Sequence, residues 1–134
     1  EAIPGLQFAK HLQRQTDKQQ LAIAAVQLAE GLQAKGIVVM TRRGIMADFV
    51  ANCRPFSTNI YAFTNVSQSR RTMTLNRGVF PFRIDFSSDP EKTLQTAFRI
   101  LKEREHFQTG EKVVIISDVL AQQRVDSIQI RVIP

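Results

Sequence analysis

The sequence of 134 residues has little cysteine, no tryptophan and no long hydrophobic run. A single cysteine, Cys53, cannot form an internal disulfide, and His11 and His106 stand outside any cluster with metal-ligand spacing. No apolar run approaches the roughly 20 residues of a membrane span, and the N-terminus lacks the layout of a secretory signal. These absences favour a reduced, cytoplasmic protein without structural metal or membrane partner. The first residue is Glu1 rather than Met, which favours a start inside a longer polypeptide.

Basic residues outnumber acidic ones, with 18 Lys and Arg against 12 Asp and Glu and a formal net charge of +6. Such a balance fits nucleic acid, a membrane surface or small anions as partners. Only two tight basic pairs occur, Arg42-Arg43 and Arg70-Arg71, and most aromatic residues lie within apolar runs. A stacking platform for single-stranded nucleic acid is therefore poorly supported. The charge favours a phosphate-bearing ligand or an acidic partner surface, and no nucleic-acid partner is expected.

Helical spacing dominates the N-terminal third of the chain. Residues 5–15 have partial helical periodicity and predict a lead-in helix. Thr16 and Gln19 form a capping-box pattern, which predicts that a second helix begins there and runs to about Lys35. One stripe of this second helix is apolar: Leu21, Ala24, Ala25, Leu28 and Leu32.

The rest of the chain alternates short β-rich runs with helical segments. Strands are predicted at 36–40, 59–64, 79–86, 112–117 and 127–133, and helices at 43–53, 66–75 and from Ser88-Asp89-Pro90-Glu91 onward, with the stripe Leu94, Ala97, Phe98 and Leu101. Three strands are apolar throughout, which is typical of a parallel sheet covered on both faces. Pro81 favours an edge or irregular position for its strand.

The last predicted strand follows the fourth without a helix between them, so antiparallel pairing at an edge is expected. Its alternation predicts that Ile128, Ile130 and Val132 point inward. Together these patterns predict one α/β domain over residues 1–134. Its expected architecture is a three-layer α/β/α sandwich around a mostly parallel five-stranded sheet, with the last strand antiparallel at an edge.

One turn has the features of an anion site, because ligands of open α/β sheets bind beyond the carboxyl ends of the strands. Strand 36–40 leads into a helix through Thr41, Arg42, Arg43, Gly44, Ile45 and Met46. A helix start supplies free amides, arginines supply charge and glycine permits close backbone approach. Spacing alone fits a capped helix with two solvated arginines equally well. No P-loop, nucleophile elbow or carboxylate pair is present, so no catalytic residue is predicted.

A series of short motifs continues from this turn. Gly44 is followed by Arg54-Pro55, the strand Ile60-Tyr61-Ala62-Phe63-Thr64, the pair Arg70-Arg71, the segment Arg77-Gly78-Val79-Phe80-Pro81 and the segment Thr109-Gly110-Glu111-Lys112-Val113-Val114. Each motif is short, but their order is specific. Over about residues 16–134 the chain resembles the C-terminal domain of pyruvate kinase.

The resemblance implies a division of labour within a longer enzyme. In that family a β/α barrel, which this chain does not contain, transfers a phosphoryl group from phosphoenolpyruvate to ADP with Mg and K ions. The C-terminal domain contributes to a tetramer interface and in many members binds a sugar-phosphate or nucleotide effector beside the turn equivalent to 41–46. The resemblance thus implies a regulatory and assembly domain that is no enzyme by itself and has no cofactor of its own. Its expected partners are the barrel of the same polypeptide and further copies of the chain.

Departures from the family pattern concern the effector site. The family turn is rich in Ser and Thr, whereas here only Thr41 and Gly44 of that pattern remain. A glycine-rich family loop is replaced by 118–126, which contains no glycine. We therefore favour a lost or altered effector site. Two other functions stay open: a free-standing phosphate- or nucleotide-binding protein of the same fold and, least favoured, nucleic-acid binding driven by charge.

Overall fold

The computed structural model describes residues 5–53, 55–117, 119 and 126–134, with only the backbone of 5–15. The elements follow the order α1 (Gly5–Leu32), β1 (Gly36–Met40), α2 (Ile45–Asn52), β2 (Asn59–Thr64), α3 (Ser67–Met73), β3 (Val79–Arg83), α4 (Pro90–Arg104), β4 (Lys112–Ser117) and β5 (Ser127–Val132). Residues 1–4, Arg54 and most of the loop 118–126 lie outside the described residues.

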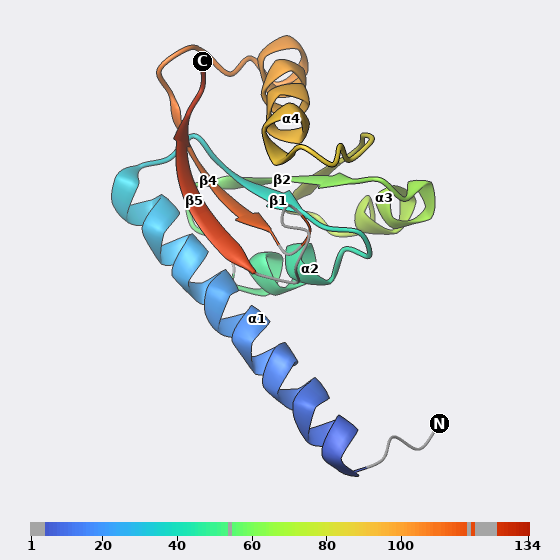
Figure 1. Cartoon of the computed structure of the whole chain (residues 1–134). Helices are drawn as coiled ribbons and strands as arrows, with labels where there is room; N and C mark the ends of the chain where they lie inside the picture. The colour runs from blue at the N-terminus through green and yellow to red at the C-terminus, as the bar shows by residue number, and fades with distance from the viewer. Residues whose placement is uncertain (1–4, 54, 118, 120–125) are drawn as a thin grey trace.

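The strands form one sheet in the order β3-β2-β1-β4-β5 (Figure 1). Strands β1 to β4 are parallel, and β5 pairs antiparallel with β4. Pro81 lies in β3, at one edge of the sheet, where its missing N–H costs no ladder hydrogen bond. The predicted fold class, the parallel order and the antiparallel edge strand are all confirmed.

Helices cover both faces of the sheet, with α1 and α2 on one side and α4 on the other (Figure 1). Three alanines of α1, Ala22, Ala25 and Ala29, are fully buried, and their small side chains allow the helix to lie close to the sheet. On the opposite face, the predicted stripe of α4 is buried over β1, β2 and β4. The central strands β1, β2 and β4 are buried almost throughout, as their unbroken apolar runs predicted.

The prediction of two N-terminal helices is wrong, because α1 is continuous from Gly5 to Leu32. Thr16 and Gln19 lie inside this helix, so their capping-box pattern does not begin one. A cap requires non-helical backbone at its first residue, and the preceding residues contain no glycine or proline after Gly5 to break the helix. Ala24 of the predicted stripe is exposed, whereas Ala22 and Ala29 are buried in its place.

The inward orientation predicted for β5 is also wrong at two positions. Ile130 and Val132 are 52% and 54% exposed, whereas Ile128 packs against the α1 side of the core. The reason lies in the position of α1, which runs mainly beneath β4, so the later part of β5 projects beyond the helix that would cover it. Strand β3 is shorter than predicted and ends at Arg83.

Among the described helices, none has the length and apolar character needed to cross a membrane.

Candidate anion-binding turn

The turn between β1 and α2 lies at the carboxyl edge of the sheet and is stabilised by hydrogen bonds to β2 and to the side chain of Thr41. Thr41 follows β1, and its amide donates to the carbonyl of Phe63 at 3.0 Å. The side chain of Thr41, only 2% exposed, accepts a hydrogen bond from the Gly44 amide at 3.1 Å. Gly44 has φ of 88° and is the N-cap of α2. The Thr41 hydroxyl therefore closes the turn by accepting this bond.

A second threonine fixes the turn from outside. The hydroxyl of Thr64, at the end of β2, donates to the carbonyl of Arg42 at 2.8 Å and accepts from the amide of Val66 at 3.1 Å. This side chain is fully buried. The position of Arg42 is thus set by the neighbouring strand, and the sequence analysis missed Thr64. The adjacency of β1 and β2 in a parallel sheet is the signal that could have found it.

Helix α3 covers the other side of the turn. Met73 of α3 is buried and packs against Gly44. The side-chain amide of Asn76, just after α3, donates to Asp48 of α2 at 3.3 Å. The turn, the start of α2 and the end of α3 therefore form one packed unit, and the role of Met73 had no local signal in the sequence.

The six predicted site residues divide into two groups. Thr41, Gly44 and Met46 are buried and serve the fold, whereas Arg42, Arg43 and Ile45 are exposed. Neither arginine has a salt-bridge partner among the described residues. The first amides of an α-helix have no acceptor within the helix, so the turn places two cations beside the N–H groups that begin α2. Such an arrangement can attract a small anion, with the charge supplied by the arginine side chains.

Outside this turn, the described residues include one thiol, that of Cys53, as a possible nucleophile. Cys53 is partly buried, its thiol donates to the carbonyl of Phe49 at 3.2 Å, and burial raises its pKa. The thiolate is the reactive form of cysteine, and a raised pKa disfavours it, so the Cys53 thiol is expected to be unreactive. Among the described residues, no group of three His, Cys, Asp or Glu could hold a metal ion. Asn65 Oδ1, next to Thr64, is buried and has no hydrogen-bond partner among the residues that the structure describes.

Comparison with known proteins decides the family. The family model described as "Pyruvate kinase, alpha/beta domain" matches residues 19–133. The chain belongs to the pyruvate kinase alpha/beta domain family. It is 34% identical over 116 residues to the chloroplastic pyruvate kinase isozyme A of Nicotiana tabacum, covering 87% of this chain and 18% of the relative. It is 35% identical over 99 residues to the chloroplastic isozyme G of Ricinus communis, covering 71% of this chain and 23% of the relative.

A solved pyruvate kinase has the same fold. The structure of Cryptosporidium parvum pyruvate kinase in complex with ADP superposes with a TM-score of 0.79 at 24% identity, covering 87% of this chain and 24% of that chain. The pyruvate kinase domain in this chain thus spans only about a fifth to a quarter of the length of these relatives. The family predicted from the motif series is confirmed.

Proposed function

We propose that this pyruvate kinase domain is an assembly and regulatory domain. The phosphoryl transfer of the intact enzyme would be carried by a catalytic part outside this chain, together with the Mg and K ions expected there. Support comes from the family and from the small share of its relatives that the chain covers. A cytoplasmic location stays a prediction, since the plant relatives named above are chloroplastic enzymes.

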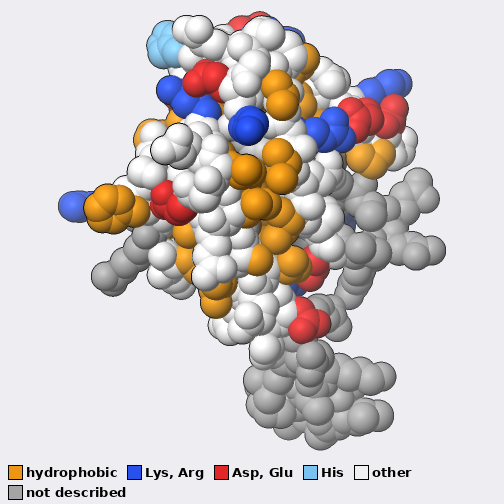
Figure 2. All heavy atoms as spheres, turned by 90° about the vertical axis from the view of Figure 1, so that its left-hand side faces the viewer, with side chains coloured by type: hydrophobic (Ala, Val, Ile, Leu, Met, Phe, Trp, Pro, Cys, Tyr) orange, Lys and Arg blue, Asp and Glu red, His pale blue; other side chains and the backbone are white. Residues whose placement is uncertain are grey.

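The observation that carries this proposal is the uncovered edge strand β5. Within the described part of the chain it pairs only with β4, so its other edge presents backbone groups that no described strand pairs with. Ile130 and Val132 are more than half exposed on the α1 face of this strand, and Ile23 of α1 is 41% exposed. Figure 2, which looks onto this side, shows hydrophobic side chains gathered in a column down the molecule. An apolar column beside a free strand edge is a surface that a second copy of the chain can cover.

Sedimentation of the chain over a range of concentrations tests this assembly role. We expect reversible self-association that weakens at least tenfold in the double variant Ile130→Asn/Val132→Asn, because the variant removes apolar area from the contact. Leu75→Asn provides a matched control, since Leu75 is 85% exposed but lies in the loop between α3 and β3. A chain that stays monomeric, or a double variant that associates like the wild type, would refute the assembly role.

We further propose that the effector site is altered or lost rather than of the ordinary sugar-bisphosphate kind. The only hydroxyl that the turn retains from the family pattern closes the turn itself, and the charge lies on Arg42 and Arg43. Any anion bound here would be held mainly by these arginines. The second candidate function, a free-standing phosphate- or nucleotide-binding protein, depends on the same two side chains.

Calorimetric titration with fructose bisphosphate, AMP and a hexose monophosphate tests whether the site is altered in this way. Weak or no binding of fructose bisphosphate is expected, and any binding that is observed should disappear in Arg42→Ala/Arg43→Ala. Tight binding of fructose bisphosphate that survives this double substitution would contradict an altered, arginine-based site. A coupled assay for phosphoryl transfer from phosphoenolpyruvate to ADP should give no turnover with this chain alone.

A further inference from the structure

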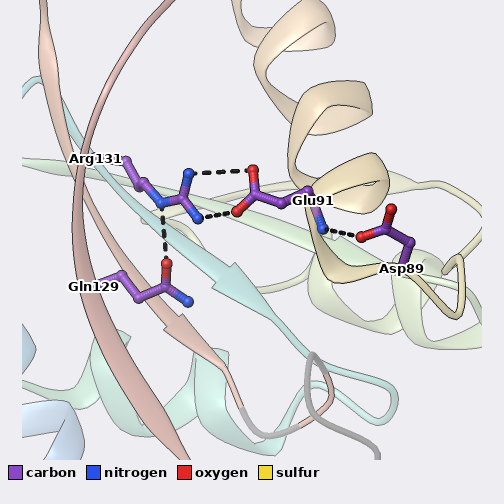
Figure 3. Close-up of polar contacts among 4 residues, drawn as sticks. All are labelled: Asp89, Glu91, Gln129 and Arg131. Atoms are coloured by element: carbon purple, nitrogen blue, oxygen red, sulfur yellow. Dashed lines mark hydrogen bonds and ion pairs between the residues drawn. The ribbon is translucent and has the colours of Figure 1, made fainter.

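Arg131 of β5 joins this strand to the start of α4 (Figure 3). Its guanidinium contacts both carboxylate oxygens of Glu91, with one N–H···O distance of 3.3 Å, and its Nε donates to the side chain of Gln129 at 3.0 Å. The hydrogen bonds from Arg131 lower the pKa of Glu91. The backbone of Glu91 is fixed at the start of α4, because its amide donates to the side chain of the N-cap residue Asp89 at 3.0 Å.

The two faces of β5 differ: one contacts α4, and the other exposes apolar side chains. Residues two apart in a strand share a face, so Gln129 and Arg131 point to the α4 side. Ile130 and Val132 alternate with them on the α1 side, where they are exposed. Val113 of β4 lies opposite Arg131 in the ladder. The exposed apolar residues therefore stand on a strand whose other face is attached to α4 through Arg131.

We propose that Arg131 is a positioning residue for self-association: it locks the later part of β5 to the first turn of α4 and so fixes the strand edge that a second copy of the chain covers. This inference rests on the assembly role proposed above. Edge strands twist and fray when one side is unpaired, and fixing such a strand in advance lowers the ordering cost of association.

The geometry is better than that of most surface ion pairs. Exposed pairs between flexible side chains usually add little, but a two-pronged Arg–carboxylate contact within a network is the favourable exception. Here the arginine side chain is 32% exposed and is oriented by Gln129 as well. A matched pair exists at the opposite edge, where Arg83 of β3 lies 3.0 Å from Asp85, which is 88% exposed.

Two measurements on the same variants test the proposal. We expect Glu91→Gln and Arg131→Gln each to weaken self-association about threefold to tenfold in sedimentation, the scale of one typical net hydrogen bond. The β5 amides should also exchange faster with solvent in both variants at a concentration where the chain is monomeric. Arg83→Gln, the control, should change neither quantity. The swapped double variant Glu91→Arg/Arg131→Glu should recover at least half of the lost affinity, which a general loss of stability would not do.

The outcomes separate this proposal from the assembly role on which it rests. Wild-type affinity in both single variants, or a swapped variant no better than the single ones, would overturn the positioning role while leaving assembly intact. A wild-type chain that never associates would remove the assembly role. In that case faster exchange of β5 in Glu91→Gln and Arg131→Gln would still support the link between α4 and β5, and unchanged exchange would overturn it.

Discussion

Met73 packs directly over Gly44: a Cβ built on Gly44 would lie 3.1 Å from Cγ of Met73 and 3.3 Å from its sulfur. The same glycine has φ of 88°, a backbone conformation that other residues rarely adopt. A single position thus combines a conformational requirement with a close contact between the start of α2 and α3. The candidate turn depends on this glycine for its shape before any ligand is considered.

Gly44→Ala should lower the free energy of unfolding by about 1–3 kcal/mol, since it adds backbone strain to a crowded contact. Urea unfolding followed by circular dichroism measures the loss. Gly78→Ala is the control and should have little effect, because no atom lies within 4 Å of its added Cβ and its φ is not positive. Equal stabilities of the two alanine variants would contradict the role given to Gly44.

Gly36 at the start of β1 faces a different constraint, the ring of Tyr61. A Cβ there would lie 2.7 Å from Cε2 of Tyr61 and 3.1 Å from Cζ of Phe107, within a cluster of aromatic rings. Gly36→Ala should destabilise the fold by about 1–3 kcal/mol through overpacking. Gly31→Ala in α1 meets no atom within 4 Å and should stabilise by about 0.5–1 kcal/mol. Opposite signs in thermal unfolding are the expected result, and a stabilised Gly36→Ala would disprove the packing argument.

Glu30 of α1 holds the loop before β2. Its carboxylate accepts hydrogen bonds from the amides of Phe56 and Ser57 at 2.6 and 3.2 Å and from the Ser57 hydroxyl at 2.6 Å. The hydrogen bonds from Ser57 lower the pKa of Glu30 below its ordinary value of 4.5. The folded chain thus favours the charged form, and this stabilisation is present above about pH 4.5 and is lost as the pH falls through the lowered pKa.

Glu30→Gln should therefore be less stable than the wild type at neutral pH, and the difference should shrink as the pH falls below 4.5. Urea midpoints measured for both proteins at several pH values give this comparison. Ser57→Ala should reproduce part of the effect, because it removes one of the donors. A difference between wild type and Glu30→Gln that stays constant down to pH 3 or so would be inconsistent with the lowered pKa.

Asp89 caps α4 within the predicted helix start Ser88-Asp89-Pro90-Glu91: its Oδ1 accepts from the Glu91 amide at 3.0 Å, and Pro90 is the first helical residue. Asp89→Ala leaves that amide without its partner and should cost about 1 kcal/mol of stability. Asp89→Asn keeps an acceptor oxygen and should stay within a few tenths of a kcal/mol of the wild type. Chemical unfolding of the three proteins measures the order, and a loss as large for asparagine as for alanine would exclude the capping role.

Local sequence patterns predicted most of the fold because they depend on neighbours along the chain. Apolar runs identified the covered parallel strands, Pro81 indicated an edge and the Asp89-Pro90 pair located the start of α4. The predictions were wrong where contacts between segments distant in the sequence determine the structure. The capping pattern at Thr16 is overridden by a helix that continues through it, and the alternation in β5 could not reveal how far α1 extends beneath the sheet.

The features of the candidate turn also fall into those that the sequence predicts and those that only the structure reveals. The sequence by itself determined that a strand ends at Met40, that a glycine turn carrying two arginines follows, and that a helix begins soon after. Only the tertiary structure decided which groups remain available to a ligand. Thr64 and Met73 reach the turn from β2 and α3, and the Thr41 hydroxyl is taken up by Gly44. Periodicity along a chain reports which side of an element is apolar, whereas the partner of a polar group depends on which elements become neighbours in space.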